Sequence, residues 1–293
     1  MYQAADNTLP FGTHAWPVMH RDFGLHMSNP IIPLVTIITV CRNAGDTIER
    51  TLQSVTAQTY PHIEYIVIDG ASTDGTVEMV RACSAVTTWI SEADKGIADA
   101  FNKGLARASG EWVGILNADD WYEPETVARV IGAIKDADIV HGAVRYWEGD
   151  KPREVYYPCQ AKLTREMTIN HPSVFVRRSV YEAEGGFDPA YRLAMDYELM
   201  LRLYVKGYRF KELGNTVLAN MSHGGASDRC WAQAFWEAAR AKLRHLSSPA
   251  STWAYCGWQL IRGSIRRVCE RLGFERIVRR ARKHISPMRK DIV

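Results

Sequence analysis

The sequence lacks a hydrophobic run long enough to cross a membrane, and its cysteines form no cluster. The longest apolar stretch, Ile31–Val40, is half the length of a spanning helix and contains a proline and threonines. Residues 1–30 have neither the basic start nor the apolar centre of a signal peptide. The six cysteines lie far apart with no C-x-x-C pair, so neither a disulfide scaffold nor a zinc knuckle is indicated. We therefore expect a cytoplasmic protein in a reducing compartment.

The sequence has little net charge overall, but basic residues are concentrated near the C-terminal end. The 293 residues are 46% apolar and 24% charged, which excludes a disordered, collagen-like or coiled-coil chain. Residues 249–293 hold eleven Lys and Arg against three acids, a local charge of +8, so the rest carries −5 of the net +3. With its tryptophans, the region 250–290 is either an interfacial helix on an anionic membrane surface or a solvated basic helix. No known nucleic-acid-binding motif accompanies the basic residues, and no nucleic-acid partner is expected.

Strand and helix patterns alternate through the first half of the chain. The β-branched run Leu34–Val40 is typical of a strand buried on both faces. A helix follows, for which Asp46 is the expected N-cap with Glu49 as its capping-box partner. Further strands are expected at Ile63–Ile68, Thr87–Ser91, Trp112–Leu116 and Asp138–Ala143, with helices between them. This order predicts an α/β fold with a doubly wound, mainly parallel sheet.

The alternation breaks beyond Val144. A strand is expected near Ser173–Arg177 and a helix over Asp196–Lys206. Two short strands, Tyr208–Lys211 and Thr216–Met221, are then expected before a helical C-terminal region.

Acidic residues follow several of the predicted strands. Asp69 follows the second strand, Glu92 and Asp94 follow the third, and Asp119-Asp120 follow the fourth. In open parallel sheets the ligand crevice lies outside these strand ends, so the acids share one edge. Gathered carboxylates repel one another, and the natural partner for them is a cation or a ligand with several donors.

The sequence also lacks the glycine-rich loops that cradle phosphates, having neither G-x-x-x-x-G-K nor G-x-G-x-x-G. If phosphate binds here, a metal must take that role. Asn117 and the acid pair Asp119-Asp120 supply hard oxygen ligands suited to Mg²⁺ or Mn²⁺. Asp46 and Asp74 stand just before helices and are more simply explained as caps. These features together suggest a nucleoside-diphosphate ligand.

Six sequence blocks in order resemble family 2 glycosyltransferases of the GT-A fold. They span about residues 33–225 and read PLVTIITVCRNAGDTIERTLQSVTAQTY, YIVIDGASTDGT, ISEADKGIADAFNKGL, GEWVGILNADDWYEP, HPSVFVRRSVYEAEGGFD and AMDYELMLRL. The resemblance implies transfer of a sugar from a nucleotide-sugar to an acceptor hydroxyl, usually with inversion, in polysaccharide or lipid-linked oligosaccharide assembly. The basic C-terminal region would allow such an enzyme to associate peripherally with the inner face of the cytoplasmic membrane.

The same resemblance assigns roles to individual residues. Asp69 corresponds to the acid that hydrogen-bonds the nucleotide base, and Asp94 to one that faces the ribose or donor sugar. Asp120 is the expected ligand of Mn²⁺ or Mg²⁺, with Asp119 at the ribose or supporting the ion. Asp196 corresponds to the general base, although its position also suits a helix N-cap. Further donor-binding residues by this correspondence are Thr39, Val40, Arg42, Lys95 and Asn117.

Weaker assignments concern two histidines and an arginine. His223 is a candidate metal or diphosphate ligand, and His171 and Arg202 are candidate acceptor contacts. The chain departs from the family at two places. The family often has two adjacent acids where this chain has Asp69-Gly70, and Glu-Asp where it has Met195-Asp196. Glu198 is expected to pair with Arg202 at i+4.

The expected organisation is an N-terminal extension over 1–30, a GT-A domain over 31–225, and a helical basic region over 226–293. Residues 31–143 would bind the nucleotide-sugar, and 144–225 would carry the acceptor site and the base. Two other functions stay open on the sequence: a nucleotidyltransferase that makes sugar nucleotides, and a non-catalytic Mg²⁺-binding α/β module. The first normally has a glycine- and arginine-rich loop near its start, which is missing here.

Overall fold

A computed structural model of the protein describes residues 32–222, 230–271 and 289–292. The helices and strands below all belong to the unit Pro33–Val293. No helix among the residues described combines the length and the apolar character that crossing a membrane requires.

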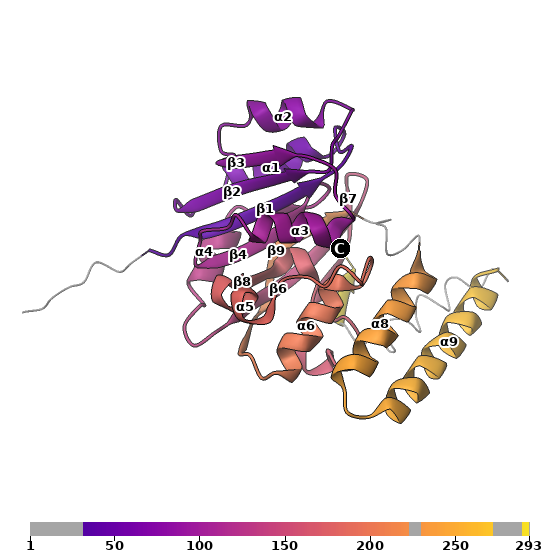
Figure 1. The fold of residues 1–293 in the computed structure, drawn as a ribbon. Helices are drawn as coiled ribbons and strands as arrows, with labels where there is room; N and C mark the ends of the chain where they lie inside the picture. The colour runs from indigo at the N-terminus through magenta and orange to yellow at the C-terminus, as the bar shows by residue number, and fades with distance from the viewer. Residues whose placement is uncertain (1–31, 223–229, 272–288, 293) are drawn as a thin grey trace, which may run out of the picture. The chain divides into compact units, whose positions relative to one another are not determined.

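The first half of this unit is a parallel sheet with helices on both faces (Figure 1). Strand β1 pairs in parallel with β2 and β4, and β2 pairs in parallel with β3. The alternation expected from the sequence is confirmed. The elements are β1 (Val35–Cys41), α1 (Ile48–Thr56), β2 (Ile63–Asp69), α2 (Thr76–Ala82), β3 (Thr88–Ser91), α3 (Ile97–Leu105) and β4 (Trp112–Asn117).

The second half extends the sheet with mainly antiparallel strands. The path runs β10-β7-β6-β8-β4-β1-β2-β3, while β9 lies parallel to β6 and antiparallel to β5. The strands are β5 (Trp121–Tyr122), β6 (Ile139–Glu148), β7 (Lys151–Tyr157), β8 (Val174–Arg177), β9 (Phe210–Ser222) and β10 (Arg289–Ile292). The helices are α4 (Thr126–Ile131), α5 (Arg178–Glu184), α6 (Met195–Val205), α8 (Trp231–His245) and α9 (Pro249–Arg271), with 3-10 turns η1 (Gln160–Lys162) and η2 (His171–Ser173).

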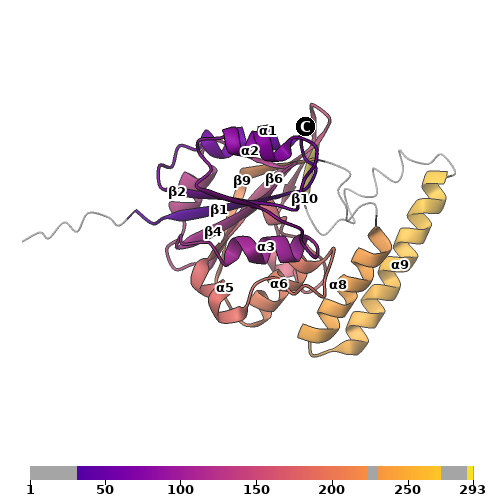
Figure 2. The ribbon, with the colours of Figure 1, turned by 45° about the horizontal axis from the view of Figure 1, so that its top comes forward.

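Two apolar clusters hold the layers together, one on each face of the sheet. Along β1, Ile37 packs with Leu52 of α1, whereas the next residue, Ile38, packs with Phe101 of α3. Side chains on a strand alternate between faces, and both faces are covered, which explains why the β1 sequence is apolar throughout. Figure 2 shows α1 and α2 on one side of the sheet and α3, α5 and α6 on the other.

Several local expectations differ from the structure. Asp46 does not cap α1, since the N-cap position is Thr47 and no side chain bonds there. The two short strands expected at 208–211 and 216–221 form one strand, β9, which passes through Gly214 at a φ of +57°. Strands β5, β7 and β10 are not among those expected. Asp74 is not the N-cap of α2 either, since that position is Gly75, but its Oδ1 accepts the Thr76 N–H at 3.2 Å.

Helices α8 and α9 pack beside α6, with α8 against α6 and α9 against α8. Glu166, in the segment between β7 and β8, fastens α9 to the sheet domain. Its Oε1 accepts hydrogen bonds from Tyr255, from Gln259 and, at 3.3 Å, from Arg262. One side of α9 is therefore turned toward the protein.

Candidate active site

The strand-end acids lie at one edge of the sheet, as their positions in the sequence predict. In the parallel register Cys41 pairs with Asp69, Asp69 with Ser91, and Val40 with Asn117. The chain therefore leaves β1, β2, β3 and β4 at the same edge. A ligand crevice is expected outside the carboxyl ends of such strands.

Asp69 is buried at the end of β2 and is held by several donors. Its Oδ2 accepts the Ser72 N–H at 2.9 Å and the Ser91 hydroxyl at 2.6 Å. Its Oδ1 accepts the Ser72 hydroxyl and the Cys41 thiol, the latter at 3.5 Å. Burial and the Asp69 charge raise the pKa of the Cys41 thiol above its usual range, so the thiol stays protonated and can donate.

Gly70 lets two of the expected donor-binding residues approach each other. A Cβ at this position would lie 2.4 Å from Asp94 Oδ2 and 3.4 Å from Arg42 Cβ. The carboxylate of Asp94 also accepts the Gly96 N–H at 2.8 Å, which fixes the turn before α3. A side chain at position 70 would therefore require the Asp94 carboxylate to move. The exposed Lys95 follows directly, and its N–H bonds to Asp99 at 3.1 Å.

Thr39 and Val40 have buried side chains. The Thr39 hydroxyl lies 3.0 Å from the hydroxyl of Tyr65, and both residues are fully buried. Val40 is 7% exposed. Any contact that these two residues make with a ligand would therefore involve mainly backbone atoms, unlike that of the exposed Arg42.

The segment after β4 carries two buried oxygen atoms without hydrogen-bond partners, Asp120 Oδ2 and Asn117 Oδ1. Burial, and next the charge of Asp119, raise the pKa of Asp120 well above its usual range. The side chain of Asp119 is exposed, and its carbonyl accepts the Ser222 hydroxyl of β9 at 3.0 Å. An orphaned carboxylate oxygen is costly to keep in a fold and is what a hard cation needs.

A divalent cation fits this segment with a partial set of protein ligands. Within residues 32–222, 230–271 and 289–292, no three His, Cys, Asp or Glu side chains gather into a metal cage. Mg²⁺ commonly uses one or two protein carboxylates and completes its shell with phosphate and water oxygens. The Asp119-Asp120 pair suits such an ion. His223, the other expected ligand, lies outside the described residues.

His171 joins the metal segment to the expected base. Its Nε2 lies 3.0 Å from Asn117 Nδ2 and 4.0 Å from Asp120 Oδ2, and its Nδ1 lies 3.8 Å from Asp196 Oδ2. Burial lowers the pKa of His171 to about 4, so the ring is neutral at pH 7. Because the Asn117 amide donates to Nε2, the proton is assigned to Nδ1, on the side of Asp196.

Asp196 sits in the first turn of α6, two residues after the N-cap position at Ala194, so it is not the cap of this helix. Its Oδ1 accepts the Tyr197 N–H at 2.7 Å, and the carboxyl is 24% exposed. A pocket with apolar walls, including Phe101, Val174 and Leu199, adjoins it and His171. Burial raises the pKa of Asp196 to about 6.

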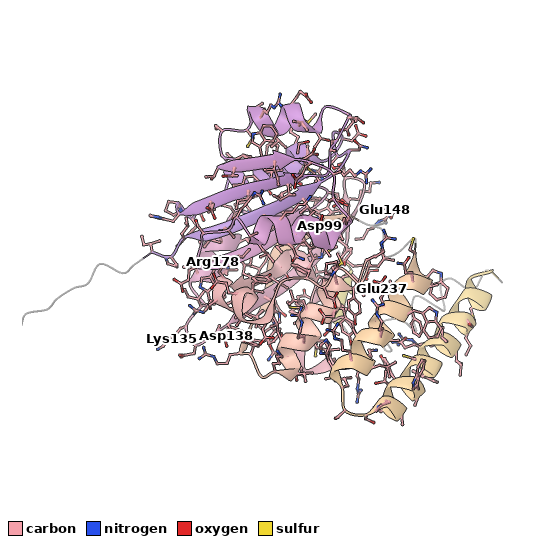
Figure 3. All side chains as sticks on the ribbon, viewed as in Figure 1. Asp99, Lys135, Asp138, Glu148, Arg178 and Glu237 are labelled. Atoms are coloured by element: carbon pink, nitrogen blue, oxygen red, sulfur yellow. The ribbon has the colours of Figure 1, made fainter. Side chains whose placement is uncertain are left out.

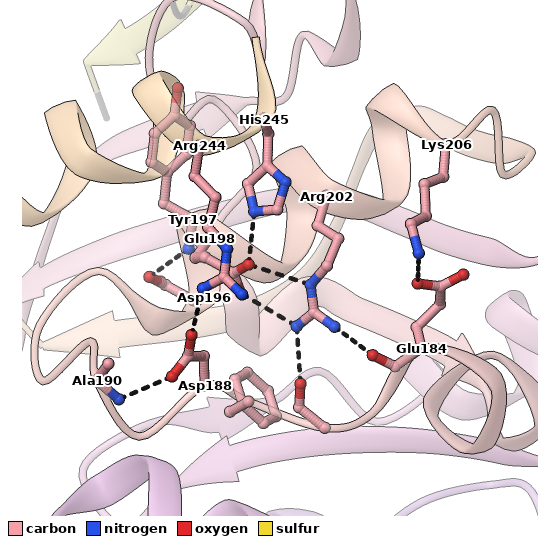
Figure 4. A network of polar contacts seen from close by, with 12 residues as sticks. Glu184, Asp188, Ala190, Asp196, Tyr197, Glu198, Arg202, Lys206, Arg244 and His245 are labelled. Carbon is pink, nitrogen blue, oxygen red and sulfur yellow. Dashed lines mark hydrogen bonds and ion pairs between the residues drawn. The ribbon is translucent and has the colours of Figure 1, made fainter.

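A largely buried polar network joins the first and last turns of α6 (Figure 4). Glu198 is 1% exposed and accepts two hydrogen bonds from Arg202, at 3.1 and 3.0 Å, as the i+4 spacing predicts. Arg202 also donates to the carbonyls of Glu184 and Gly186. With its guanidinium occupied in this way, Arg202 supports the helix that carries Asp196. His245 of α8 completes the network, with Nε2 at 2.7 Å from Glu198.

Glu237 of α8 is a site residue that sequence reasoning missed (Figure 3). Its Oε2 accepts the N–H groups of Arg192, Leu193 and Ala194 at 2.9, 2.7 and 3.0 Å, which fixes the chain entering α6. Burial alone would raise the pKa of Glu237, but these hydrogen bonds hold it below its usual value. A single glutamate in a helical stretch carries no sequence signal for this task.

Comparisons with known proteins agree with this arrangement. The model of the family described as Glycosyl transferase family 2 matches residues 36–184. An uncharacterized glycosyltransferase of Mycobacterium tuberculosis is 34% identical over 179 residues, which cover 58% of this chain and 68% of that protein. A PGL/p-HBAD biosynthesis glycosyltransferase of Mycobacterium bovis is 28% identical over 211 residues, which cover 67% of this chain and 80% of that protein.

Two solved structures share the fold. Staphylococcus aureus TarS 1–349 with UDP-GlcNAc superposes with a TM-score of 0.58 at 16% identity, over 76% of this chain and 70% of that one. The mannosyltransferase PcManGT of Pyrobaculum calidifontis, with GDP-Man and Mn²⁺, gives a TM-score of 0.55 at 22% identity, over 80% of this chain and 75% of that one. At these identities the likeness concerns the fold, a mixed α/β sheet of the GT-A kind.

Proposed function

This chain belongs to glycosyl transferase family 2 and is a glycosyltransferase, and we propose that it transfers a sugar from a nucleoside-diphosphate donor to an acceptor hydroxyl with inversion, using a divalent cation. The observation that carries the proposal is the position of His171 between two carboxylates. It lies within 4.0 Å of the orphaned Asp120 oxygen on one side and 3.8 Å from Asp196 on the other. The proposed cation ligand and the proposed base thus lie on either side of the same imidazole ring.

The donor is proposed to bind at the strand-end edge, within residues 31–143. Two structures that share the fold are those of TarS with UDP-GlcNAc and of PcManGT with GDP-Man and Mn²⁺, which supports a nucleotide-sugar as the donor class. Asp120, with Asp119, would hold Mn²⁺ or Mg²⁺, which when bound would neutralise charge on the diphosphate. Asp69, Asp94, Arg42 and Lys95 are proposed to contact the nucleoside and sugar.

Asp196 is proposed as the general base. Its Oδ2 would accept the proton of the acceptor hydroxyl while that oxygen attacks the anomeric carbon opposite the diphosphate. A single base suffices for a one-step inversion. The apolar pocket beside Asp196 raises its pKa to about 6, which keeps it ionised at neutral pH and makes it a stronger base than an exposed aspartate.

The acceptor is proposed to be a glycan or lipid-linked glycan, bound within residues 144–225 near His171. Relatives named for PGL/p-HBAD biosynthesis and for teichuronic acid biosynthesis support a role in glycan assembly. The proposed place of action is the cytoplasm, at the inner face of the membrane where the acceptor is lipid-linked. No nucleic-acid partner is proposed.

The test is a donor panel with two variants. Purified protein is incubated with Mn²⁺, UDP- or GDP-sugars and an extract of lipid-linked acceptors. The nucleotide products are measured, and donor affinity is measured by calorimetry. We expect Asp196→Asn to bind donor with unchanged affinity and to lose about 10²-fold or more of the transfer rate, because no carboxylate takes the proton. Glu49→Gln, which changes an exposed carboxylate in the first turn of α1, should behave as the unaltered enzyme.

Two results would contradict the proposal. Normal transfer by Asp196→Asn would remove this residue from the base role. Release of pyrophosphate, in place of a nucleoside diphosphate, would favour the nucleotidyltransferase reaction. The transfer rate of the variant tests the base, and the identity of the released product tests the reaction type, so the two results are independent.

A further inference from the structure

Helices α8 and α9 expose large apolar side chains on adjoining surfaces. On α8, Trp231 and Trp236 are 44% and 52% exposed, and the residues of α9 reach 59%. Trp236 and Trp253 approach each other across the two helices, with ring centroids 6.4 Å apart. We call this surface the α8–α9 apolar face. Its members are Trp236, Trp253, Trp258, Ile261 and Ile265.

The apolar face on α9 points away from the protein. Trp258, Ile261 and Ile265 recur at helical spacing of three and four, so they share one side of the helix. Thr252 and Cys256 are each 3% exposed, and the Glu166 hydrogen bonds from Tyr255 and Gln259 lie on the same protein-facing side. The buried Thr252 and Cys256 thus lie on the side of α9 opposite Trp258, Ile261 and Ile265, and the Glu166 contacts hold the helix in this orientation.

This surface carries no exposed carboxylate. Between residues 230 and 265 the only acid is Glu237, which is 8% exposed and occupied by the backbone of 192–194. The chain from 249 to the end holds eleven Lys and Arg against three acids. The α8–α9 apolar face, which has no exposed acid, therefore belongs to a part of the chain with an excess of basic residues. A binding partner that matches both properties has an apolar layer bordered by negative charge.

We propose that the α8–α9 apolar face docks on the surface of an anionic lipid bilayer. Tryptophan concentrates at membrane–water boundaries, and isoleucines beside it bury apolar area among the acyl chains. Basic residues near the surface add attraction to anionic headgroups. A second copy of the chain is a poorer occupant, since a face-to-face dimer would bring together two α9 helices that each carry four arginines and one acid. This inference goes beyond the proposed reaction and does not depend on it.

The test uses the full-length protein and vesicles without donor or acceptor. Binding is measured by flotation with phosphatidylglycerol-containing vesicles and with pure phosphatidylcholine vesicles. We expect binding to the anionic vesicles only, with a loss in high salt because screening weakens the charge attraction. W258S/I261S/I265S should bind at least about 10-fold more weakly, since three half-exposed apolar side chains no longer enter the bilayer.

The matched control is M79S/V205S, which removes apolar side chains exposed to 37% and 47% on α2 and α6. It should bind vesicles as the unaltered protein does. Circular dichroism and thermal unfolding check that both variants fold. Equal binding to both vesicle types, or unchanged binding by the triple variant, would overturn the proposal. So would a dimer in vesicle-free buffer that the triple variant converts to a monomer, because the face then belongs to a second copy.

Discussion

At the residue scale, Asp120 is a buried carboxyl group whose surroundings disfavour its own charge. It is 2% exposed, one of its oxygens has no partner, and Asp119 lies beside it. Structural carboxylates are normally paired when buried, so this one costs stability while the cation is absent. Such a cost is typical of residues kept for function.

This cost gives the first prediction at the residue scale. Asp120→Asn removes the buried charge and should leave stability unchanged or raise it, by up to about 1–2 kcal/mol in metal-free buffer. The same change should abolish the Mn²⁺-dependent part of donor binding. Calorimetry with and without Mn²⁺ and thermal unfolding measure the two effects. Asp150→Asn, at a side chain 93% exposed, serves as the control, and Mn²⁺-dependent binding that survives in Asp120→Asn would refute the assignment.

The pKa of Asp196 gives the second prediction. As a base it acts when ionised, and burial raises its pKa to about 6. We expect kcat/KM for the acceptor to be constant above that pH and to fall about tenfold for each unit below it. Donor binding is followed separately by calorimetry, so that loss of donor affinity in acid is not mistaken for loss of the base. A profile that stays flat down to about pH 5 would contradict a raised pKa at the essential base.

Much of the candidate site follows from the sequence at this scale, but not all of it. Asp69, Asp94 and Asp120 could be placed at one edge because parallel strands end together, and a strand end is visible as the end of an apolar run. The contacts of His171 could not be predicted, because its partners Asn117 and Asp196 lie 54 and 25 residues away in the sequence. Only tertiary packing brings these residues together. His245 and Glu237 are similar cases, held on a helix that the sequence does not relate to α6.

At the scale of elements, α8 fixes the chain that enters α6. Glu237 accepts three backbone N–H groups just before the turn with Asp196. Glu237→Gln should lower the free energy of unfolding by about 1.5–3 kcal/mol, the usual range for hydrogen bonds to a charged group. It should also lower kcat, because the base loses its fixed position. Urea unfolding and steady-state kinetics measure the two, and Glu182→Gln, an exposed partner of Arg178, is the control.

The pH dependence of that effect has a definite sign. Hydrogen bonds hold the pKa of folded Glu237 below its ordinary value of 4.5. The stabilisation is therefore fully present above about 4.5 and is lost as the pH falls through the lower, folded value. The difference in stability between the unaltered protein and Glu237→Gln should shrink in acid. A difference that grows as the pH falls would show that the carboxylate is not the stabilising form.

The elements that the sequence predicts are those with the strongest local signal. β1, β2 and β4 are long β-branched or apolar runs buried on both faces, and the pattern alone identifies them. β7 has a half-polar pattern, and β5 has two residues, too few for any pattern. β9 looks interrupted because Gly214 and Asn215 are turn residues. The strand pairs with β6 on both sides of these two residues, with a register shift between the paired parts, and tertiary pairing of this kind is not visible in the local sequence.

At the scale of the whole chain, charge is divided between an acidic majority and a basic C-terminal segment, −5 against +8. If the enzyme meets a lipid-linked acceptor at an anionic surface, salt should act on the two substrates differently. We expect the KM for acceptor in phosphatidylglycerol-containing vesicles to rise severalfold between low and high salt, because the attraction is screened. Donor hydrolysis, measured without vesicles, should change little. Equal salt sensitivity of the two would contradict surface attraction as the cause.

The crowding of donors around Asp69 has a consequence for how a nucleotide enters. A carboxylate offers about four lone-pair sites, and here Ser72, Ser91 and Cys41 already occupy them. An incoming base can share this carboxylate only by exchange with one of those groups. A serine hydroxyl turns about a single bond and can release its place cheaply, whereas the Ser72 N–H is fixed in the backbone. If Asp69 binds the nucleotide base as proposed, the base would replace a serine hydroxyl as a hydrogen-bond donor to Asp69. Until the nucleotide binds, that hydroxyl satisfies the carboxylate in place of water.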